Sequence, residues 1–446
     1  MRSIRDEYEF ALRGAVRQVG LGIRQWGYSK QYELIEEAFD NPWSLEPFCR
    51  RLLKDVLTYA RNRVPYYREI FQNTRIQNSI EPPPDLGSFP LLTKKEIRNH
   101  FRHLVSVDYK KMRRRLLSTS GSTGRPLQVV QDNVDIRWAL AAEEYYYRHF
   151  VGIDHFRARK VLLRRDYMTP KGIRRLYSER IENTVMLGCL QLSKSRLERY
   201  LRVFNAYKPE LIQGNASYLY AISRFLEKRG TLVSKPKAIV SMSEVLHDFM
   251  RETIERAFGA KVYDFYGTRE APSIAGECSQ GLMHIFTYQN QVEALESLSS
   301  QGKELAITTL HNFSMPLIRY RIGDEAILGP RSCSCGCQLP TLKSIIGRTA
   351  DYFLTKDGRL VHGFIFILML RRNRSIESFK IIQEDYDRIR MLVVAETLDK
   401  RWTDLVDEKT RELMGINCKV VWELVDEIPE SAGGKYSFAS SMLYKG

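Results

Sequence analysis

A loop rich in small hydroxyl residues and glycines lies between two apolar segments, at residues 116–130 (LLSTSGSTGRPLQVV). Glycine lets backbone N–H groups approach an anion closely, and neighbouring hydroxyls add hydrogen-bond donors at little steric cost. The loop is therefore a candidate phosphate site. Its residue order is neither that of the Walker A loop nor that of the dinucleotide-binding G-x-G-x-x-G turn. The alternative for such a loop, taken alone, is a plain linker.

A second group of residues has the chemistry of metal ligands. Cys333, Cys335 and Cys337 lie in CSCGC, and Cys278 and His284 lie in ECSQGLMHI. A structural Zn²⁺ takes four sulfur or nitrogen ligands, and a Cys-x-Cys turn followed by glycine suits two thiolates. Clustered cysteines in a long chain without a signal peptide favour a metal over disulfides. The alternatives are reduced cysteines without a metal, and a histidine that is part of the core.

Length and composition restrict the class of protein. The chain has 446 residues, more than the roughly 250–300 of a single core, so two or more domains are expected. Its net charge of +16 favours anionic partners, although the Cys/His spacing matches no common zinc finger and makes nucleic acid unlikely. No apolar run approaches the roughly 18–20 residues of a membrane span, and the N-terminus lacks the apolar core of a signal peptide. We expect a cytoplasmic protein, with a homodimer as an open possibility.

Hydrophobic periodicity predicts the elements that must position these residues. Residues 1–80 have mostly helical spacing, and Thr93 with Glu96 forms a capping box. Between about 116 and 310, short apolar strands alternate with amphipathic segments, which indicates an α/β domain with parallel strands. After Gly347 the pattern changes to a hairpin, a further strand pair, a helix and a last strand.

This change of pattern predicts two domains. We place a large N-terminal α/β domain at residues 1–346, with a helical lead-in at 1–85. A small α+β C-terminal domain is expected at 347–446, joined by a hinge near 347–351.

Five segments together resemble the motifs of the adenylate-forming (AMP-binding) superfamily, in the family's order, over roughly residues 85–446. SGSTGRP resembles its P-loop, YDFYGTRE its Tyr-Gly-x-Thr-Glu motif, and MPLIRYRIGDEA its Tyr-Arg-x-Gly-Asp motif. SIIGRTADYF resembles the hinge region, and IPESAGGKYSF the C-terminal loop with the catalytic lysine. FPLLTKKEIR and the cysteine-rich insert are similar to the phenylacetate–coenzyme A ligase branch and the CapK-like capsular-polysaccharide branch.

The resemblance implies a reaction in two halves. A carboxylic acid would be activated by ATP and Mg²⁺ to an acyl-adenylate, with release of pyrophosphate. The acyl group would then pass to an anionic acceptor: coenzyme A, a carrier-protein thiol or an amine-bearing saccharide. The alternative is a non-catalytic nucleotide-binding homologue. Arg269 and Ala350 support this alternative, since they stand where the family usually has Thr and Asp.

The resemblance also implies roles for particular residues. Phosphate and nucleotide contacts would come from the two Gly-containing motifs and from the strand and hinge motifs that follow: Ser120, Gly121, Ser122, Thr123, Gly124, Tyr266, Gly267, Thr268, Arg269, Asp324 and Arg348. Tyr266 would stack on adenine and Asp324 would accept both ribose hydroxyls. Glu270 would hold Mg²⁺, and Lys435 would bridge the acid and the α-phosphate. The zinc ligands would be Cys278, His284, Cys333 and Cys335, with Cys337 as the alternative fourth ligand.

Two further hypotheses concern the acid and its acceptor. Ser243 and Glu244 occupy positions where relatives line the acyl and adenine pocket, although Ser243 could equally be a helix N-cap. The basic segment 148–180, which includes Arg164 and Arg165, suggests docking of an anionic acceptor. The alternative is a solvated basic face.

Overall fold

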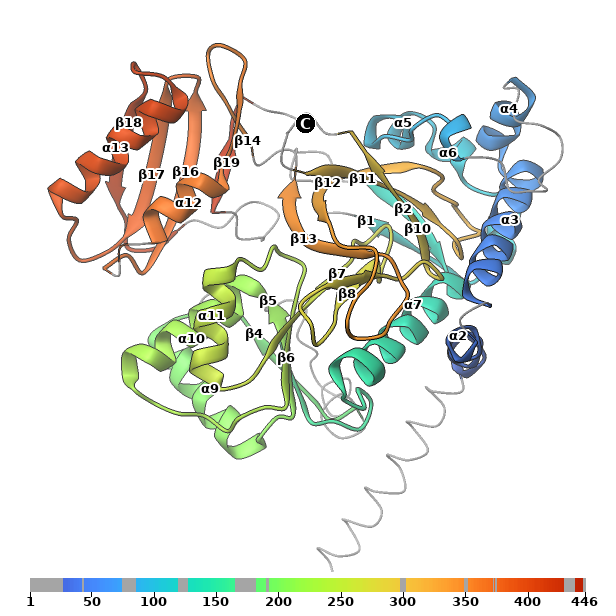
Figure 1. Cartoon of the computed structure of the whole chain (residues 1–446), viewed down its shortest axis with the longest axis horizontal. Coiled ribbons are helices and arrows are strands. Elements are labelled where there is room, and N and C mark those ends of the chain that lie inside the picture. Colours follow the sequence, from blue (N-terminus) through green and yellow to red (C-terminus); the bar gives the residue numbers. More distant parts are fainter. Residues whose placement is uncertain are drawn as a thin grey trace, which may run out of the picture.

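The computed structural model describes residues 27–41, 44–73, 86–118, 127–164, 182–189, 192–296, 302–348, 352–371, 373, 375–428 and 438–443. These residues form a large part built on one mixed sheet and a small C-terminal part, drawn in orange and red in Figure 1. The predicted α/β architecture with a small α+β part is confirmed. Within the described ranges, no helix is long and apolar enough to cross a bilayer.

The described residues begin with helices, as expected, and these lie together at one side of the molecule (Figure 1). They are α2 (Ser29–Asp40), α3 (Leu45–Arg63), α4 (Pro65–Asn73), α5 (Lys94–Asn99) and α6 (Phe101–Leu104), with the short 3₁₀ turns η1 (Leu86–Ser88) and η2 (Tyr109–Lys111). The capping box is present at α5: the Thr93 hydroxyl accepts from the Glu96 N–H, and the Glu96 carboxylate accepts from the Thr93 N–H.

The described strands of the large part form one main sheet and one hairpin. The order in the main sheet is β10-β11-β12-β13-β9-β8-β7-β6-β5-β3-β4. Its parallel half consists of β3 (Lys160–Arg164), β4 (Thr184–Gly188), β5 (Leu211–Asn215), β6 (Ala238–Met242) and β7 (Val262–Tyr266). Its antiparallel half consists of β8 (Ala275–Glu277), β9 (Met283–Ile285), β10 (Asn290–Leu295), β11 (Lys303–Thr309), β12 (Tyr320–Leu328) and β13 (Thr341–Arg348).

Helices cover both faces of the parallel half. Successive strand residues point to opposite faces, so the apolar strands present side chains to a helix layer on each side. Val161, Leu163 and Ile212 pack with α9 (Lys194–Tyr207), α10 (Ala216–Arg229) and α11 (Asp248–Phe258). Leu211 and Val240 pack on the other face, with α7 (Asn133–Tyr146) and the π-helical turn η3 (Tyr147–Val151). The aromatic residues Trp138 and Tyr145 to Tyr147 are buried in this second core.

A hairpin precedes α7 and carries the ends of the hydroxyl-rich loop. Strands β1 (Arg114–Ser118) and β2 (Gln128–Asp132) pair antiparallel, with Ser118 opposite Gln128. Residues 119–126, between these paired ends, lie outside the described residues.

The small part contains a hairpin, a four-stranded sheet and two helices. Strands β14 (Tyr352–Leu354) and β15 (Leu360–His362) flank the predicted turn, with Gly358 at φ +83°. The sheet has the order β18-β17-β16-β19, and its elements are α12 (Phe364–Arg371), β16 (Ser378–Asp385), β17 (Arg388–Val394), α13 (Lys400–Met414), β18 (Lys419–Leu424) and β19 (Ala439–Ser441). The architecture thus changes after β13, close to the expected hinge near 347–351, and the domain boundary stays a prediction.

Candidate nucleotide site and candidate metal site

Two of the expected nucleotide contacts meet across the main sheet. The Tyr266 hydroxyl, at the end of β7, donates to Asp324 Oδ2 of β12 over 2.8 Å. Four steps of the sheet order separate β7 from β12, or about 19 Å in a flat sheet. The two side chains are too short to span that distance, so the sheet bends between β7 and β12. This bend brings motifs from both halves of the sheet to one place.

The segment after β7 is a tight turn with several internal contacts. The Thr268 N–H donates to the Ala271 carbonyl over 3.0 Å, and the Thr268 hydroxyl accepts from the Ala271 N–H over 3.0 Å. A Cβ on Gly267 would lie 2.9 Å from the backbone nitrogen of Ser273, so any side chain here would force the backbone apart. The turn therefore needs the glycine of the FYGT motif for steric reasons.

Arg269 links this turn to the base of the hydroxyl-rich loop. Its guanidinium donates to the carbonyl of Ser118, the last described residue before residues 119–126. The side chain is otherwise exposed. A guanidinium has five donors, so this hydrogen bond leaves others for a phosphate. The arrangement gives Arg269 a structural contact that the usual Thr is too short to make.

Glu270 is a buried carboxylate beside a tyrosine that the sequence analysis did not assign. It is 8 % exposed, and the Tyr320 hydroxyl donates to its Oε1 over 3.4 Å. Carboxylate oxygen is the ligand that Mg²⁺ prefers, and one protein carboxylate with substrate phosphates is a usual set. The residue fits the expected role in its chemistry. Tyr320 lies in the RYRIGD motif, and its place in that motif is the sequence signal that could have identified it as a site residue.

Arg348 ends β13 directly opposite Asp324 of β12 in the strand register. The backbones of these two expected nucleotide contacts are thus neighbours. Gly347, just before, has φ +129°, a conformation that L side chains rarely adopt.

Glu244 caps a helix, whereas its neighbour Ser243 does not. The Glu244 carboxylate accepts from the Asn215 side-chain amide over 2.8 Å and from the Ser217 N–H over 2.9 Å. It therefore caps α10, a helix that starts nearly thirty residues before it. Ser243 has φ +71°, and α11 has His247 as its N-cap, so the interpretation of Ser243 as an N-cap is wrong. An acidic group at a helix N-terminus is favourable because it compensates the helix dipole.

Several expected site residues fall outside the described part of the chain. These are the loop residues Ser120, Gly121, Ser122, Thr123 and Gly124, the hinge residue Ala350, the basic residue Arg165 and the expected catalytic residue Lys435. Their roles stay predictions.

The described part of the basic segment 148–180 is largely neutralised. Arg148 pairs with Glu144 at 2.8 Å, and Arg157 lies 3.7 Å from Asp154. Arg164, at the end of β3, is partly buried, and this burial lowers the pKa of its guanidinium. These contacts favour a structural role for the described arginines over an open docking face.

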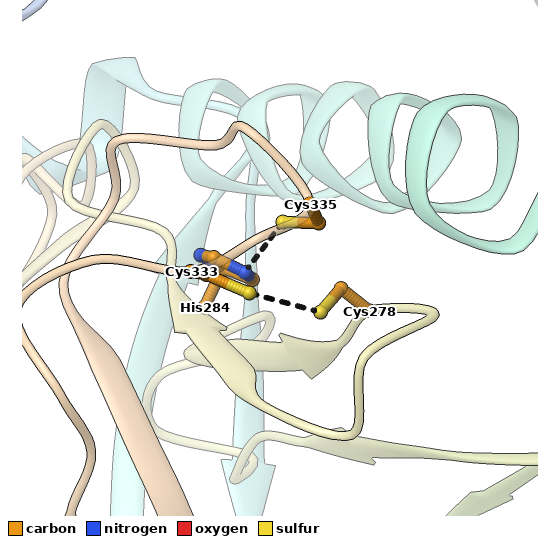
Figure 2. A group of neighbouring side chains, drawn as sticks. All are labelled: Cys278, His284, Cys333 and Cys335. Atoms are coloured by element: carbon orange, nitrogen blue, oxygen red, sulfur yellow. Dashed lines mark hydrogen bonds between the residues drawn. The ribbon is translucent and has the colours of Figure 1, made fainter.

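The four expected zinc ligands lie together beside the sheet, as Figure 2 shows. The candidate ligand atoms of Cys278, His284, Cys333 and Cys335 lie within 4.8 Å of one another. Cys278 Sγ and Cys333 Sγ are 3.7 Å apart, and Cys335 Sγ is 3.2 Å from His284 Nε2. Cys278 and His284 come from the β8–β9 hairpin. Cys333 and Cys335 come from the connection between β12 and β13.

These distances fit a tetrahedral zinc site. Zn–S bonds of about 2.3 Å place two sulfurs about 3.8 Å apart on the edge of a tetrahedron. His284 Nδ1 lies 3.3 Å from the Leu339 carbonyl, a partner that orients the ring and leaves Nε2 facing the cysteines. Burial lowers the pKa of His284, which favours the neutral imidazole that a metal needs.

Cys337 does not join the group. It packs in the aromatic core around α7 and lies near Tyr145 and Tyr288. The geometry therefore favours Cys278, His284, Cys333 and Cys335 over any set that includes Cys337.

Comparison with solved structures places the fold. 2-Hydroxyisobutyryl-CoA ligase in the postadenylation state, in complex with R3-HIB-AMP, superposes with a TM-score of 0.67 at 17% identity, covering 88% of each chain. The same ligase in the thioesterification state, with 2-HIB-AMP and CoA, gives a TM-score of 0.56 at 18% identity, covering 90% of this chain and 91% of the ligase. The fold is that of the adenylate-forming CoA ligases.

Sequence comparison narrows the similarity. Residues 353–441 match the model of the CapK C-terminal domain. Protein CapK of Staphylococcus aureus is 25% identical over 403 residues, covering 86% of this chain and 87% of CapK. The phenylacetate-coenzyme A ligase of Thermus thermophilus is 24% identical over 422 residues, covering 86% and 93%. The predicted resemblance to the phenylacetate–coenzyme A ligase and CapK branch is confirmed.

Proposed function

We propose that this protein activates a carboxylic acid with Mg-ATP and transfers the acyl group to a thiol or an amine. The observation that carries the proposal is the meeting of Tyr266 and Asp324, 2.8 Å apart, beside the turn that Arg269 ties to the loop base. Motifs far apart in the chain converge there. The similarity to phenylacetate-coenzyme A ligases and to CoA ligases solved with acyl-adenylates supports the same reaction.

In the first half-reaction, a carboxylate oxygen attacks the α-phosphorus of ATP and pyrophosphate leaves. The ring of Tyr266 would stack on adenine, and Asp324 would accept hydrogen bonds from the ribose hydroxyls. Glu270 would hold Mg²⁺ together with phosphate oxygens. The loop residues Ser120 to Gly124 would bind the outer phosphates, and Lys435 would neutralise charge between the acid and the α-phosphate.

In the second half-reaction, a thiol or amine attacks the acyl carbon and AMP leaves. Coenzyme A is the first acceptor to test, because the relatives include coenzyme A ligases. A carrier-protein thiol and an amine-bearing saccharide are the alternatives, and the CapK similarity is the reason for including the saccharide.

The arrangement of the two parts is closer to that of the solved ligase after adenylation than to that of the same ligase during thioester formation. The superposition is better on the postadenylation structure, with a TM-score of 0.67, than on the thioesterification structure of the same ligase, at 0.56. We infer that the small part changes its orientation between the two half-reactions.

The proposal is tested by carboxylate-dependent exchange of labelled pyrophosphate into ATP, across aryl, short hydroxy, fatty and amino acids. Exchange with one acid class, lost in Lys435→Ala, would establish adenylation and define the substrate. ATP binding without exchange for every acid would favour the non-catalytic homologue that Arg269 and Ala350 suggest.

We also propose that the four-residue Cys/His group holds a structural Zn²⁺. Three thiolates and one imidazole match the donor preference of zinc and leave no open position for catalysis. The ion would fasten the β8–β9 hairpin to the connection between β12 and β13, next to the bend that brings Tyr266 to Asp324.

A further inference from the structure

An aromatic side chain of the small part lies against the large part. The carbonyl of Phe438 accepts from the Ile381 N–H of β16 over 2.8 Å, and its ring centroid is 5.2 Å from that of Phe379. Phe438 is thereby fixed in the small sheet. The same ring lies 6.2 Å from Phe249 at 74° and 6.3 Å from His247 at 67°. Both of these partners belong to the start of α11 in the large part.

The surface that receives Phe438 is built from several rings. His247 and Phe249 stack at 5.7 Å with their planes 8° apart, and Tyr220 of α10 meets Phe249 edge-on at 5.4 Å. These separations and angles lie in the range that aromatic pairs prefer. We call Tyr220, His247 and Phe249 the aromatic platform.

The aromatic platform lies next to the edge of the sheet that carries the candidate nucleotide site. It follows β6 in the chain, and β6 pairs with β7, which ends at Tyr266. Phe438 lies three residues after Lys435, and three residues of chain span at most about 11 Å. The position of Phe438 therefore limits how far the expected catalytic residue Lys435 can lie from the platform.

One ion pair accompanies the aromatic contact. Lys228 of α10 lies 2.7 Å from Glu377, just before β16. Both side chains are largely exposed, so the pair adds little binding energy. The rings therefore contribute more to this contact than the ion pair does, and their removal should weaken the hold on the small part.

We propose that Phe438 is a positioning residue that holds the small part on the aromatic platform for adenylation, and that this contact opens before acyl transfer. The proposal rests on the proposed two-step function. Its support is the placement of Phe438 between Phe379 and the platform, together with the closer match to the postadenylation structure.

The experiment compares the two half-reactions in Phe438→Ala, Phe438→Leu and wild type. Pyrophosphate exchange measures the first half, and thioester formation from chemically prepared acyl-adenylate and coenzyme A measures the second. We expect Phe438→Ala to lower the exchange rate about tenfold and to change thioester formation less than twofold, with Phe438→Leu intermediate. Tyr386→Ala, which removes an exposed aromatic residue of the small part, is the matched control and should change neither rate.

Equal losses in both half-reactions, or no loss of exchange, would overturn the positioning role. Small-angle X-ray scattering of the same proteins gives a readout that does not depend on the acid. The radius of gyration should increase in Phe438→Ala and stay unchanged in Tyr386→Ala. An unchanged radius of gyration in Phe438→Ala would refute the role of Phe438 in holding the small part, even if adenylation is established. Conversely, the radius of gyration could increase in Phe438→Ala while wild type shows no pyrophosphate exchange with any acid. This result would refute the proposed reaction and leave Phe438 as a residue that holds the two parts together.

Discussion

The guanidinium of Arg269 donates a hydrogen bond to the backbone carbonyl of Ser118, 151 positions earlier in the chain. This contact joins the turn after β7 to the last described residue of β1, where the hydroxyl-rich loop begins. A departure from the usual motif thus has a physical consequence, because threonine could not reach the same carbonyl. The arginine fixes the position of one motif relative to another.

This contact makes Arg269 a testable determinant of nucleotide affinity. In Arg269→Gln the charge-assisted hydrogen bond to Ser118 is lost, and the dissociation constant for ATP should rise about tenfold. Isothermal titration calorimetry measures this without knowledge of the acid. Arg102→Gln, at an exposed arginine of α6, is the control and should bind ATP as wild type does. Unchanged affinity in Arg269→Gln would mean that the contact does not support the site.

Asp324 should distinguish ribose from 2′-deoxyribose. A carboxylate accepts from two adjacent hydroxyls, so wild type should bind ATP at least tenfold more tightly than 2′-deoxy-ATP. Asp324→Asn should bind both nucleotides weakly and with similar affinity. Tyr266→Phe, which removes the hydroxyl at 2.8 Å from Asp324 and keeps the ring, should preserve the preference. A retained preference in Asp324→Asn would place the ribose elsewhere.

The metal proposal predicts a difference between two cysteines that lie close in sequence. Cys335→Ser removes a ligand and should reduce bound zinc from about one ion per chain to well below half, measured by mass spectrometry of the purified protein. Cys337→Ser is the matched control, because Cys337 packs in the aromatic core and not in the ligand group. Equal zinc contents in the two variants would contradict the assigned ligands. The thermal midpoint should also fall in Cys335→Ser and after chelation of wild type.

A buried histidine should make the protein sensitive to acid. Burial lowers the pKa of His311 to about 3, while its ring stacks on Trp138 at 4.0 Å and its Nε2 lies 2.8 Å from the Tyr288 carbonyl. The unfolded chain takes up a proton near pH 6.5 and the folded chain only near pH 3. The stabilising contribution is therefore complete above about pH 6.5 and decreases as pH falls through this window.

The measurement is the free energy of unfolding in urea at pH 5 and pH 6. In His311→Phe, which keeps a ring on Trp138, the difference between the two pH values should shrink by about 1 kcal/mol relative to wild type. His103→Gln, at an exposed histidine of α6, should leave the difference unchanged. An unaltered difference in His311→Phe would show that His311 is not the acid-sensitive group.

Local elements were predictable from the sequence because their signals are local. Alternating apolar residues define β16 and β17, and the Thr93 and Glu96 pair caps α5 as expected. The contacts between distant segments were not predictable in the same way. Periodicity contains no information on the sheet bend, on the pairing of Arg269 with Ser118, or on Phe438 packing against α11. Ser243 was misassigned because serine before an amphipathic segment is typical of an N-cap. In the structure Ser243 has a left-handed backbone conformation, and α11 begins only after His247.

The metal group also has consequences for the order in which the chain folds. The 48 residues between His284 and Cys333 include β10, β11 and β12, and therefore Asp324 and Tyr320. An ion that bridges both ends closes this segment into a loop, which removes about 3 kcal/mol of chain entropy before the strands pair. With zinc at the proposed site, the supply of the metal during synthesis would then affect how quickly the strands that carry Asp324 and Tyr320 pair.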